Sequence, residues 1–297
     1  MEPVEIITGK TRLLGLIGYP VRHTISPGLH NTLSAALGQD YVYLPFEVHP
    51  TNLEKAVTGL QALGFTGFNV TIPYKEEVIK YLDRLSREAE LIGAVNTVKI
   101  CDRKLTGYNT DAEGFARSFA EMTGTGLKNK KMLVIGAGGT ARAIAVKAAL
   151  EGASKIYIVN RTRNKSENIV NIINQYITDI AESHDLDSIF ELVPCSDVII
   201  NTTPLGMHPD VDKSPVEDSV LLKILKPSHI VYDVIYNPDK TRLLLCAEKA
   251  GCKIVNGLGM LFYQGIHAYE IWTETTIEKN ILDEVYQAFL KISQRFG

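Results

Sequence analysis

Short apolar runs alternate with amphipathic stretches over the first hundred residues. The apolar runs predict three buried strands: Leu13–Gly18, Tyr41–Val48 and Gly67–Thr71. The amphipathic stretches predict two helices: 28–37 and 51–63. In the second helix Leu53, Val57 and Leu60 share one face. Pro73 favours the start of a further helix, because proline fits the first helical position. This order indicates an α/β domain with a mainly parallel sheet covered by helices.

A second pattern begins near residue 110. Thr110 and Glu113 have the spacing of a capping box, in which side chains satisfy the first helix amides. Gly124-Thr125-Gly126 predicts the end of that helix. Strands and helices then follow in doubly wound order: strand 131–135, helix 140–150, strand 155–160, helix 164–177, strand 197–201 and strand 230–234.

The first strand-to-helix junction of this second pattern carries a glycine-rich loop. Gly136-Ala137-Gly138-Gly139-Thr140-Ala141 fits the G-x-G-x-x-A pattern. Its glycines let backbone amides approach a pyrophosphate, and the helix N-terminus adds partial positive charge. The loop predicts a dinucleotide-binding site of the Rossmann type. A tight turn without a ligand is the alternative.

The segment after the next strand bears on the choice of cofactor. It reads Asn160-Arg161-Thr162-Arg163-Asn164-Lys165 and lacks the acidic residue that would bind a ribose 2′-hydroxyl. Three cations and a hydroxyl favour a 2′-phosphate instead, so we expect NADP rather than NAD. A solvated basic turn is the alternative.

The chain length accommodates two domains, since domains usually contain about 100–150 residues. We predict that residues 1–112 and 251–297 form a substrate-binding and catalytic domain, and that 113–250 form the dinucleotide-binding Rossmann domain. The residues after Gly251 predict a glycine-rich turn and helices that return to the first domain. We expect a cleft between the two domains.

Composition narrows the partners and the compartment. The net charge of −3 gives no basic surface for nucleic acid or for an anionic membrane. The four cysteines form no CxxC pair and the seven histidines are scattered, so neither a disulfide framework nor a metal site is expected. Early acidic residues argue against a signal peptide, and no apolar run approaches the roughly 20 residues of a membrane span. We expect a cytoplasmic monomer or homodimer acting on a small molecule.

Polar residues gather at the predicted strand ends of the first domain: Thr24, Ser26, Asn69, Thr71, Lys75, Asn96 and Asp111. Hydroxyls and amides suit a polyhydroxylated ring, because they both donate and accept hydrogen bonds. A dehydrogenase also needs a group that takes the alcohol proton, and a lysine held by a carboxylate can do so. Lys75 and Asp111 are the candidates. The alternative places Lys75 on the helix surface and lets Asp111 only assist a helix start.

The chain resembles the shikimate dehydrogenase family nearly from end to end. The matching motifs, in order, are Thr24-Ile25-Ser26-Pro27, Asn69-Val70-Thr71-Ile72-Pro73-Tyr74-Lys75, Gly93-Ala94-Val95-Asn96-Thr97, Asn109-Thr110-Asp111, the glycine loop, Asn160-Arg161-Thr162, Asn201-Thr202-Thr203-Pro204-Leu205-Gly206-Met207, Asp233-Val234-Ile235-Tyr236-Asn237-Pro238 and Gly257-Leu258-Gly259-Met260-Leu261 with Gln264. The resemblance implies reversible, NADPH-dependent reduction of 3-dehydroshikimate to shikimate, in the pathway to chorismate and the aromatic amino acids.

The resemblance also implies residue roles. Lys75 and Asp111 match the catalytic pair. Thr24 and Ser26, helped by Tyr236, match the residues that bind the substrate carboxylate. The ring hydroxyls are bound by residues that match Thr71, Asn96, Asp111 and Gln264. The cofactor is bound by the glycine loop and by a further set: Asn160, Arg161, Thr162, Lys165, Thr202, Met207 and Gly257.

Two departures from the family pattern leave alternatives open. The family usually has serine where this chain has Thr24, and the added methyl group narrows the pocket and stiffens χ1. Lys165 stands where arginine is frequent and lacks its bidentate geometry. A quinate/shikimate dehydrogenase using NAD or NADP is therefore the nearest alternative. A non-catalytic NADP-binding regulator is the more distant one.

Overall fold

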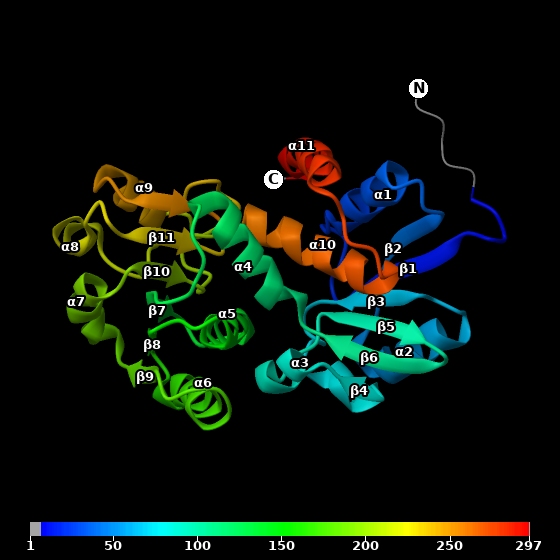
Figure 1. Ribbon diagram of the computed structural model, residues 1–297, viewed down its shortest axis with the longest axis horizontal. Coiled ribbons are helices and arrows are strands. Elements are labelled where there is room, and N and C mark those ends of the chain that lie inside the picture. Colours follow the sequence, from blue (N-terminus) through cyan, green and yellow to red (C-terminus); the bar gives the residue numbers. More distant parts are fainter. Residues whose placement is uncertain (1–6, 297) are drawn as a thin grey trace. The chain divides into compact units, whose positions relative to one another are not determined.

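The computed structural model describes residues 7–296 and divides them into two compact units (Figure 1). Unit 1 contains the described residues up to Thr110 together with those from Gln264 onward, and unit 2 runs from Asp111 to Tyr263. Both boundaries fall at or inside helices, because α4 (Thr110–Thr123) and α10 (Leu258–Thr273) each have residues in both units.

Unit 1 is built on a six-stranded sheet with the order β2-β1-β3-β5-β6-β4. Its strands are β1 (Arg12–Gly18), β2 (Tyr41–Glu47), β3 (Gly67–Val70), β4 (Arg84–Leu85), β5 (Thr97–Cys101) and β6 (Lys104–Tyr108). Its helices, besides parts of α4 and α10, are α1 (Ser26–Ala36), η1 (Pro50–Asn52), α2 (Leu53–Ala62), η2 (Glu77–Tyr81), α3 (Arg87–Ile92) and α11 (Lys279–Phe296). The predicted mainly parallel sheet is confirmed, since only β5 runs against its neighbours.

The sequence prediction for unit 1 failed at two places. Pro73 does not open a helix: it lies in a turn closed by the Tyr74 amide, which donates to the Thr71 carbonyl, and η2 starts only at Glu77. The β5–β6 hairpin was not predicted. Its turn residues Asp102 and Arg103 have φ values of 48° and 60°, a conformation that usually calls for glycine and gave no glycine signal here.

Unit 1 is closed by residues that come late in the chain. Trp272 of α10 is buried, and its indole N–H donates to the Val98 carbonyl of β5 at 2.9 Å. Gly67 of β3 makes room for this indole, because a Cβ there would lie 2.3 Å from Trp272. Tyr269, one turn earlier, is also fully buried.

Unit 2 is built on a six-stranded, fully parallel sheet with the order β12-β11-β10-β7-β8-β9. Its strands are β7 (Lys131–Ile135), β8 (Lys155–Val159), β9 (Ala181–His184), β10 (Val198–Asn201), β11 (Ile230–Asp233) and β12 (Lys253–Val255). Its helices are α5 (Gly139–Leu150), α6 (Arg163–Tyr176), η3 (Leu186–Ser188), α7 (Ile189–Leu192), η4 (Val193–Cys195), α8 (Asp218–Ile224) and α9 (Arg242–Lys249). The predicted boundary at residue 251 is wrong, because β12 adds a strand to this sheet and unit 2 continues to Tyr263.

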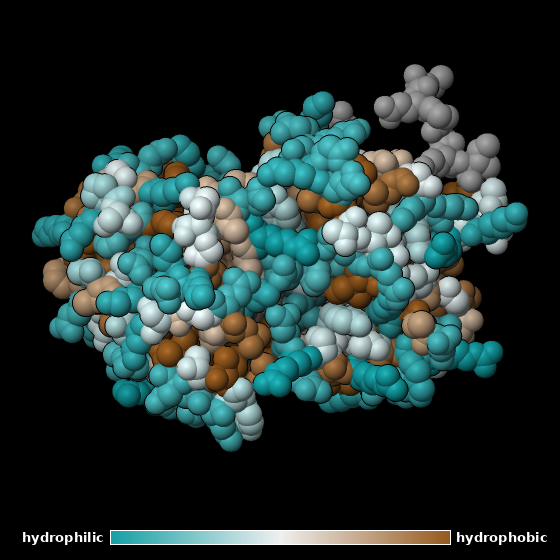
Figure 2. Space-filling view, viewed as in Figure 1, coloured by the Kyte–Doolittle hydropathy of each residue, from teal (hydrophilic) through white to brown (hydrophobic). Residues whose placement is uncertain are grey.

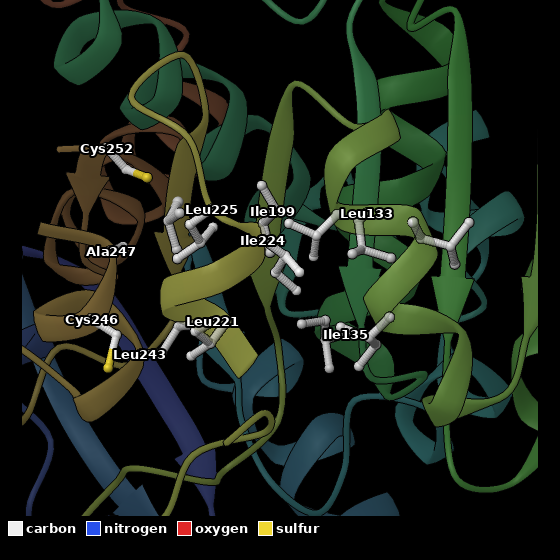
Figure 3. Packing of buried hydrophobic residues seen from close by; sticks show 14 of the residues in the cluster. Leu133, Ile135, Ile199, Leu221, Ile224, Leu225, Leu243, Cys246, Ala247 and Cys252 are labelled. Atoms are coloured by element: carbon white, nitrogen blue, oxygen red, sulfur yellow. The ribbon is translucent and has the colours of Figure 1, made fainter. Parts of the chain in front are cut away.

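The parallel sheet is possible because its central strands are apolar on both faces. All four residues of β10 are buried, and so are four of the five residues of β7. On one face Leu221, Ile224 and Leu225 from α8 and the residue after it pack toward Leu133 and Ile199 (Figure 3). Cys246 and Cys252 belong to the same cluster as buried thiols.

The face drawn in Figure 2 is mostly hydrophilic, with apolar residues in scattered patches. No helix of residues 7–296 is both long and apolar enough to span a bilayer. Within the same range no three His, Cys, Asp or Glu residues gather as a metal site. The expectation about a signal peptide falls partly on residues 1–6, which lie outside the described residues.

Candidate active site

A buried network of amides and hydroxyls lies at the centre of unit 1. We call it the amide–hydroxyl network, and its members are Tyr43, Asn69, Asn96, Thr97, Thr110 and Gln264. Asn96 is its hub: its Oδ1 accepts the Thr110 amide at 2.8 Å, and its Nδ2 donates to the Thr110 hydroxyl at 3.0 Å. The Thr110 hydroxyl lies 3.5 Å from Oε1 of Gln264. The structure thus brings together two predicted ring-binding residues, Asn96 and Gln264, through Thr110.

The predicted carboxylate-binding hydroxyls lie on the loop that follows β1. Thr24 is half-buried, and its Oγ1 accepts the Ser26 amide at 3.3 Å. Ser26 is the first residue of α1. Thr71 comes close to the end of β1, because Gly18 has no side chain: a Cβ there would lie 2.3 Å from the Thr71 methyl group. Thr71 is fixed further by its amide, which donates to the Ile17 carbonyl.

Lys75 follows the turn after β3 and is half-buried. Its carbonyl accepts the Val95 amide at 2.7 Å, which ties the Lys75 backbone to the residue before Asn96. Asp111, its predicted partner, is the second residue of α4 and belongs to unit 2. Tyr236 belongs to unit 2 as well, whereas the other predicted substrate residues belong to unit 1.

The glycine loop lies at the topological switch point of the parallel sheet, where β7 has β10 on one side and β8 on the other. Gly136 has a φ of 112°, and a Cβ there would lie 2.4 Å from the Thr202 hydroxyl, so only glycine fits. Gly138 and Gly139 are exposed and face open space at the N-terminus of α5. An open cradle of backbone at a helix N-terminus suits a pyrophosphate.

The basic segment after β8 contains cations in two different situations. Arg163 opens α6 and pairs with Glu167 at 3.0 Å and with Asp185 at 3.6 Å. Arg161 and Lys165 are exposed and form no ion pair with any described residue. Asn160 Nδ2 donates to the Thr162 carbonyl and shapes the turn. Arg161 and Lys165 therefore remain available to a 2′-phosphate, whereas Arg163 is already neutralised.

A buried carboxylate organises the ends of β10 and β11. Asp233 accepts hydrogen bonds from Asn201 Nδ2 at 3.0 Å, from the Thr241 hydroxyl at 2.7 Å and from the Ile235 amide at 3.1 Å. Burial raises the pKa of Asp233, and these hydrogen bonds oppose the rise. The carboxylate thereby fixes the loops that carry Thr202 and Tyr236.

Gly257 lies beside the same loops. Its amide donates to the Ile235 carbonyl at 3.0 Å, and a Cβ there would lie 1.9 Å from the Val234 carbonyl oxygen. The side chains of Met207 and Tyr236 are 46% and 44% exposed, so both can contact a ligand. The structure thus groups Thr202, Gly257 and Tyr236 around the ends of neighbouring strands.

The predicted capping box at the start of α4 is wrong. The Thr110 amide, which Glu113 would have satisfied, donates to Asn96 instead. Glu113 pairs with Lys147 of α5 at 2.6 Å and with Arg117 at 2.9 Å. Burial works against the charge of Glu113, but hydrogen bonds from Lys147 and Arg117 outweigh it and lower its pKa to about 2. Glu113 thus links α4 to α5.

The sequence analysis assigned no ligand-site role to three residues that shape these sites: Tyr43, Thr110 and Asp233. Tyr43 and Asp233 are fully buried, and their partners are distant in sequence. The sequence around Asp233 could have indicated its role, because an acidic residue at the end of an apolar strand needs buried hydrogen-bond donors.

The strand order of unit 2 and its glycine loop define the class of protein. It has a Rossmann-type dinucleotide-binding unit and a second α/β unit in the same chain. Three family models match successive parts of the chain. The "Shikimate dehydrogenase substrate binding domain" matches residues 16–98, "Shikimate / quinate 5-dehydrogenase" matches 118–234, and "Shikimate 5'-dehydrogenase C-terminal domain" matches 257–280. The chain belongs to the shikimate dehydrogenase family.

Individual relatives match over nearly their whole length. A shikimate dehydrogenase (NADP(+)) from Desulforamulus reducens is 42% identical, over 94% of this chain and 96% of its own. Shikimate 5-dehydrogenase from Listeria monocytogenes, solved with shikimate and NAD, is 41% identical with a TM-score of 0.89, over 96% of this chain and all of its own. A shikimate dehydrogenase solved with NADP+ is 40% identical with a TM-score of 0.86, over 98% of each chain.

Proposed function

We propose that this protein catalyses the reversible reduction of 3-dehydroshikimate to shikimate with NADPH, as an alcohol oxidoreductase of the pathway to chorismate and the aromatic amino acids. The observation that carries the proposal is its near full-length similarity to NADP-dependent shikimate dehydrogenases. Unit 1 contains polar residues that suit the hydroxylated ring of the substrate, and unit 2 contains a glycine loop that suits a dinucleotide.

Most of the groups that hold the substrate are neutral and belong to unit 1, whereas Tyr236 and the Asp111 carboxylate belong to unit 2. Thr24 and Ser26, with Tyr236 of unit 2, bind the carboxylate. The ring hydroxyls bind to Thr71, Asn96, Asp111 and Gln264. Neutral donors and acceptors suit hydroxyl groups, and a buried site of this kind rejects an analogue that lacks one of them.

Lys75 is the proton donor in the reduction. When bound, NADPH supplies the hydride that adds to the ketone carbon. The Lys75 ammonium group gives its proton to the ketone oxygen, and in the oxidation the neutral amine takes that proton back. Asp111 orients the Lys75 ammonium group and accepts a hydrogen bond from a neighbouring ring hydroxyl.

In unit 2 the cofactor is held by backbone amides and by selected side chains. Gly136-Ala137-Gly138-Gly139-Thr140-Ala141 receives the pyrophosphate. Arg161 and Lys165 bind the 2′-phosphate, supported by Asn160 and Thr162 around the turn. Thr202, Met207 and Gly257 lie toward the nicotinamide end.

A second function is supported by two observations. The family model for residues 118–234 covers both shikimate and quinate dehydrogenases, and the Listeria relative was solved with NAD. Thr24 affects the choice between shikimate and quinate, and Lys165 affects the choice between NADP and NAD. A quinate/shikimate dehydrogenase that uses NAD or NADP is therefore the second candidate.

Initial rates of absorbance change at 340 nm test these proposals, with shikimate and quinate crossed against NADP and NAD. The first candidate requires activity that is largely confined to shikimate with NADP. Comparable rates with quinate or with NAD select the second candidate. Tight NADP binding without any hydride transfer to these acids would indicate a non-catalytic regulator and reject both.

We infer further that the protein acts in the cytoplasm on small molecules, as a monomer or homodimer and without a nucleic-acid or membrane partner. The net charge of −3 and the absence of disulfides among the described cysteines support this assignment. Light scattering of the purified protein distinguishes the monomer from the dimer, and a larger assembly would contradict the inference.

A further inference from the structure

Tyr43 is a member of the amide–hydroxyl network that none of the assigned roles explains. Tyr43 of β2 is fully buried, and its hydroxyl donates to Asn69 Oδ1 at 2.7 Å. Its ring stacks on His30 of α1, with ring centroids 4.2 Å apart and an interplanar angle of 21°. The Tyr43 hydroxyl is thus held at one end of the network by packing on a buried neighbour.

The Asn69 amide is held at both of its ends. The two ends have the same shape, but one end accepts and the other donates. Nδ2 donates to the Asn96 carbonyl at 3.0 Å and to the Thr97 hydroxyl at 2.9 Å. Because a carbonyl can only accept, this contact fixes the orientation of the amide and turns Oδ1 toward β2. The Tyr43 hydroxyl supplies the donor that Oδ1 then requires.

Further hydrogen bonds connect Thr97 to the predicted ring-binding residues. The Thr97 hydroxyl donates its proton to Asn96 Oδ1 at 3.1 Å, and that oxygen also accepts the Thr110 amide. Nδ2 of Asn96 then donates to the Thr110 hydroxyl, which lies near Gln264. Each link uses a buried group, so reversing one amide leaves like groups facing each other.

The surroundings of Tyr43 keep its hydroxyl a donor. Burial raises the pKa of Tyr43, so the hydroxyl keeps the proton that it donates. Burial lowers the pKa of His30 to about 3, with a smaller opposing effect from Asn69, so the stacked ring stays uncharged. Neither group changes its charge near neutral pH.

We propose that Tyr43 is a positioning residue for substrate recognition: by pairing Oδ1 it holds the Asn69 amide in place, and Nδ2 of that amide holds the Asn96 carbonyl and the Thr97 hydroxyl beside the predicted ring-binding groups. The inference rests on the proposed function, because it assigns the ring hydroxyls to this part of unit 1. It extends the specificity of the site to a strand that carries none of the assigned residues.

The variant Tyr43→Phe tests the proposal, because it keeps the ring and its stacking and removes only the donor. Steady-state rates at 340 nm should show kcat/KM for shikimate falling about tenfold, mostly through a higher KM, since a buried acceptor is left unpaired. The dissociation constant of NADP, measured by fluorescence titration, should not change. An effect of less than about twofold on kcat/KM would overturn the proposal.

Tyr41→Phe is the matched control. Tyr41 lies two residues earlier on the same face of β2, is 5% exposed, and its hydroxyl accepts a hydrogen bond from Arg12 at 2.7 Å. Both variants remove a hydroxyl from a buried tyrosine of one strand. Equal kinetic losses in both would show that general destabilisation, and not the network, is responsible.

A double-mutant cycle with Asn69→Ala tests the route of the effect. If Tyr43 acts through Asn69, then Tyr43→Phe should have little further effect on KM once Asn69 is replaced. A full additional loss would contradict the proposal. If Tyr43→Phe does not fold, Asn69→Asp breaks the next link while keeping its shape and its acceptor, and an unchanged KM would then reject the network. Absence of shikimate oxidation by the unmodified protein would instead reject the proposed function.

Discussion

The two units of this protein differ in the charge of the polar side chains buried around their sheets. In unit 1 the buried polar groups are neutral, and the amide–hydroxyl network contains no charged side chain. In unit 2 carboxylates join the neutral buried groups: Asp233 is buried at the strand ends, and Glu113 pairs with Lys147 between two helices. Both sheets are mainly parallel, so strand direction does not explain the contrast.

The ligands proposed for the two units also differ in charge. A ring with several hydroxyl groups is matched by amides and hydroxyls, whose direction can be set one hydrogen bond at a time. A dinucleotide carries phosphates, which are matched by backbone amides at a helix N-terminus and by cations such as Arg161. Substitutions should therefore affect the two ligands separately.

The largest effect should come from Lys75→Ala. Turnover should fall by about 10²–10⁴-fold, the usual cost of removing a general acid–base group, while the dissociation constant of NADP stays the same. Rates at 340 nm and a fluorescence titration measure the two quantities. Lys80→Ala is the control, because Lys80 is an exposed lysine five residues later. Unchanged turnover in Lys75→Ala would remove Lys75 from its proposed role.

A smaller effect, confined to unit 2, should come from the double variant Arg161→Ala/Lys165→Ala. The KM for NADP should rise about 10–100-fold because two charge-assisted contacts to the 2′-phosphate are lost. The KM for NAD should not rise, since NAD lacks that phosphate. Arg163→Ala is the control, because its guanidinium group is already paired with Glu167 and Asp185. Equal losses with NADP and NAD would contradict the assignment.

Glu113→Gln should weaken unit 2 in a pH-dependent way. The native pKa of Glu113 is about 2, below its ordinary value of 4.5. The charged pair therefore stabilises the native state above pH 4.5, and this contribution is lost as pH falls toward 2. At pH 7 the substitution should lower the free energy of unfolding by about 2 kcal/mol, measured in urea. The control Glu182→Gln removes a more exposed partner of Lys155 and should cost less. Equal losses at pH 7 and pH 3 would contradict this interpretation.

His30→Phe should give the smallest change, and in unit 1. Burial lowers the pKa of His30 from 6.5 to about 3, so below pH 6.5 the unfolded chain gains a proton that the native state does not accept. This term destabilises the wild type as pH falls from 6.5 toward 3, by on the order of 1 kcal/mol at pH 5.5. The variant should lose less thermal stability than the wild type between pH 7 and pH 5.5. The exposed His49 provides the control, as His49→Gln should leave the slope unchanged.

The elements of unit 2 could be predicted closely where burial is complete. Strand 131–135 was predicted at its observed bounds, because a parallel central strand is apolar throughout. Three-residue β12 and the short edge strand β9 were missed, since so few residues establish no pattern. In unit 1 the turn at Asp102 and Arg103 gave no glycine signal, and the β5–β6 hairpin was missed with it.

The residue types of the candidate site could be read from the sequence, but their arrangement could not. Asn96 and Gln264 were selected separately, and nothing in the sequence indicated that Thr110 connects them. Glu113 had the right spacing for a capping box, yet Lys147 on another helix attracts it more strongly. Contacts between distant segments are decided by packing, which local patterns do not encode.

The place of Trp272 has a consequence for synthesis on the ribosome. The Trp272 indole packs against Gly67 and Val98 of the amino-terminal sheet, but Trp272 is translated only after the whole of unit 2. Domains usually fold as they emerge from the ribosome. Here the sheet of unit 1 emerges first but lacks Trp272 of α10 until the sheet of unit 2 has been translated in full. The order of synthesis and the order of completion are therefore reversed between the two units.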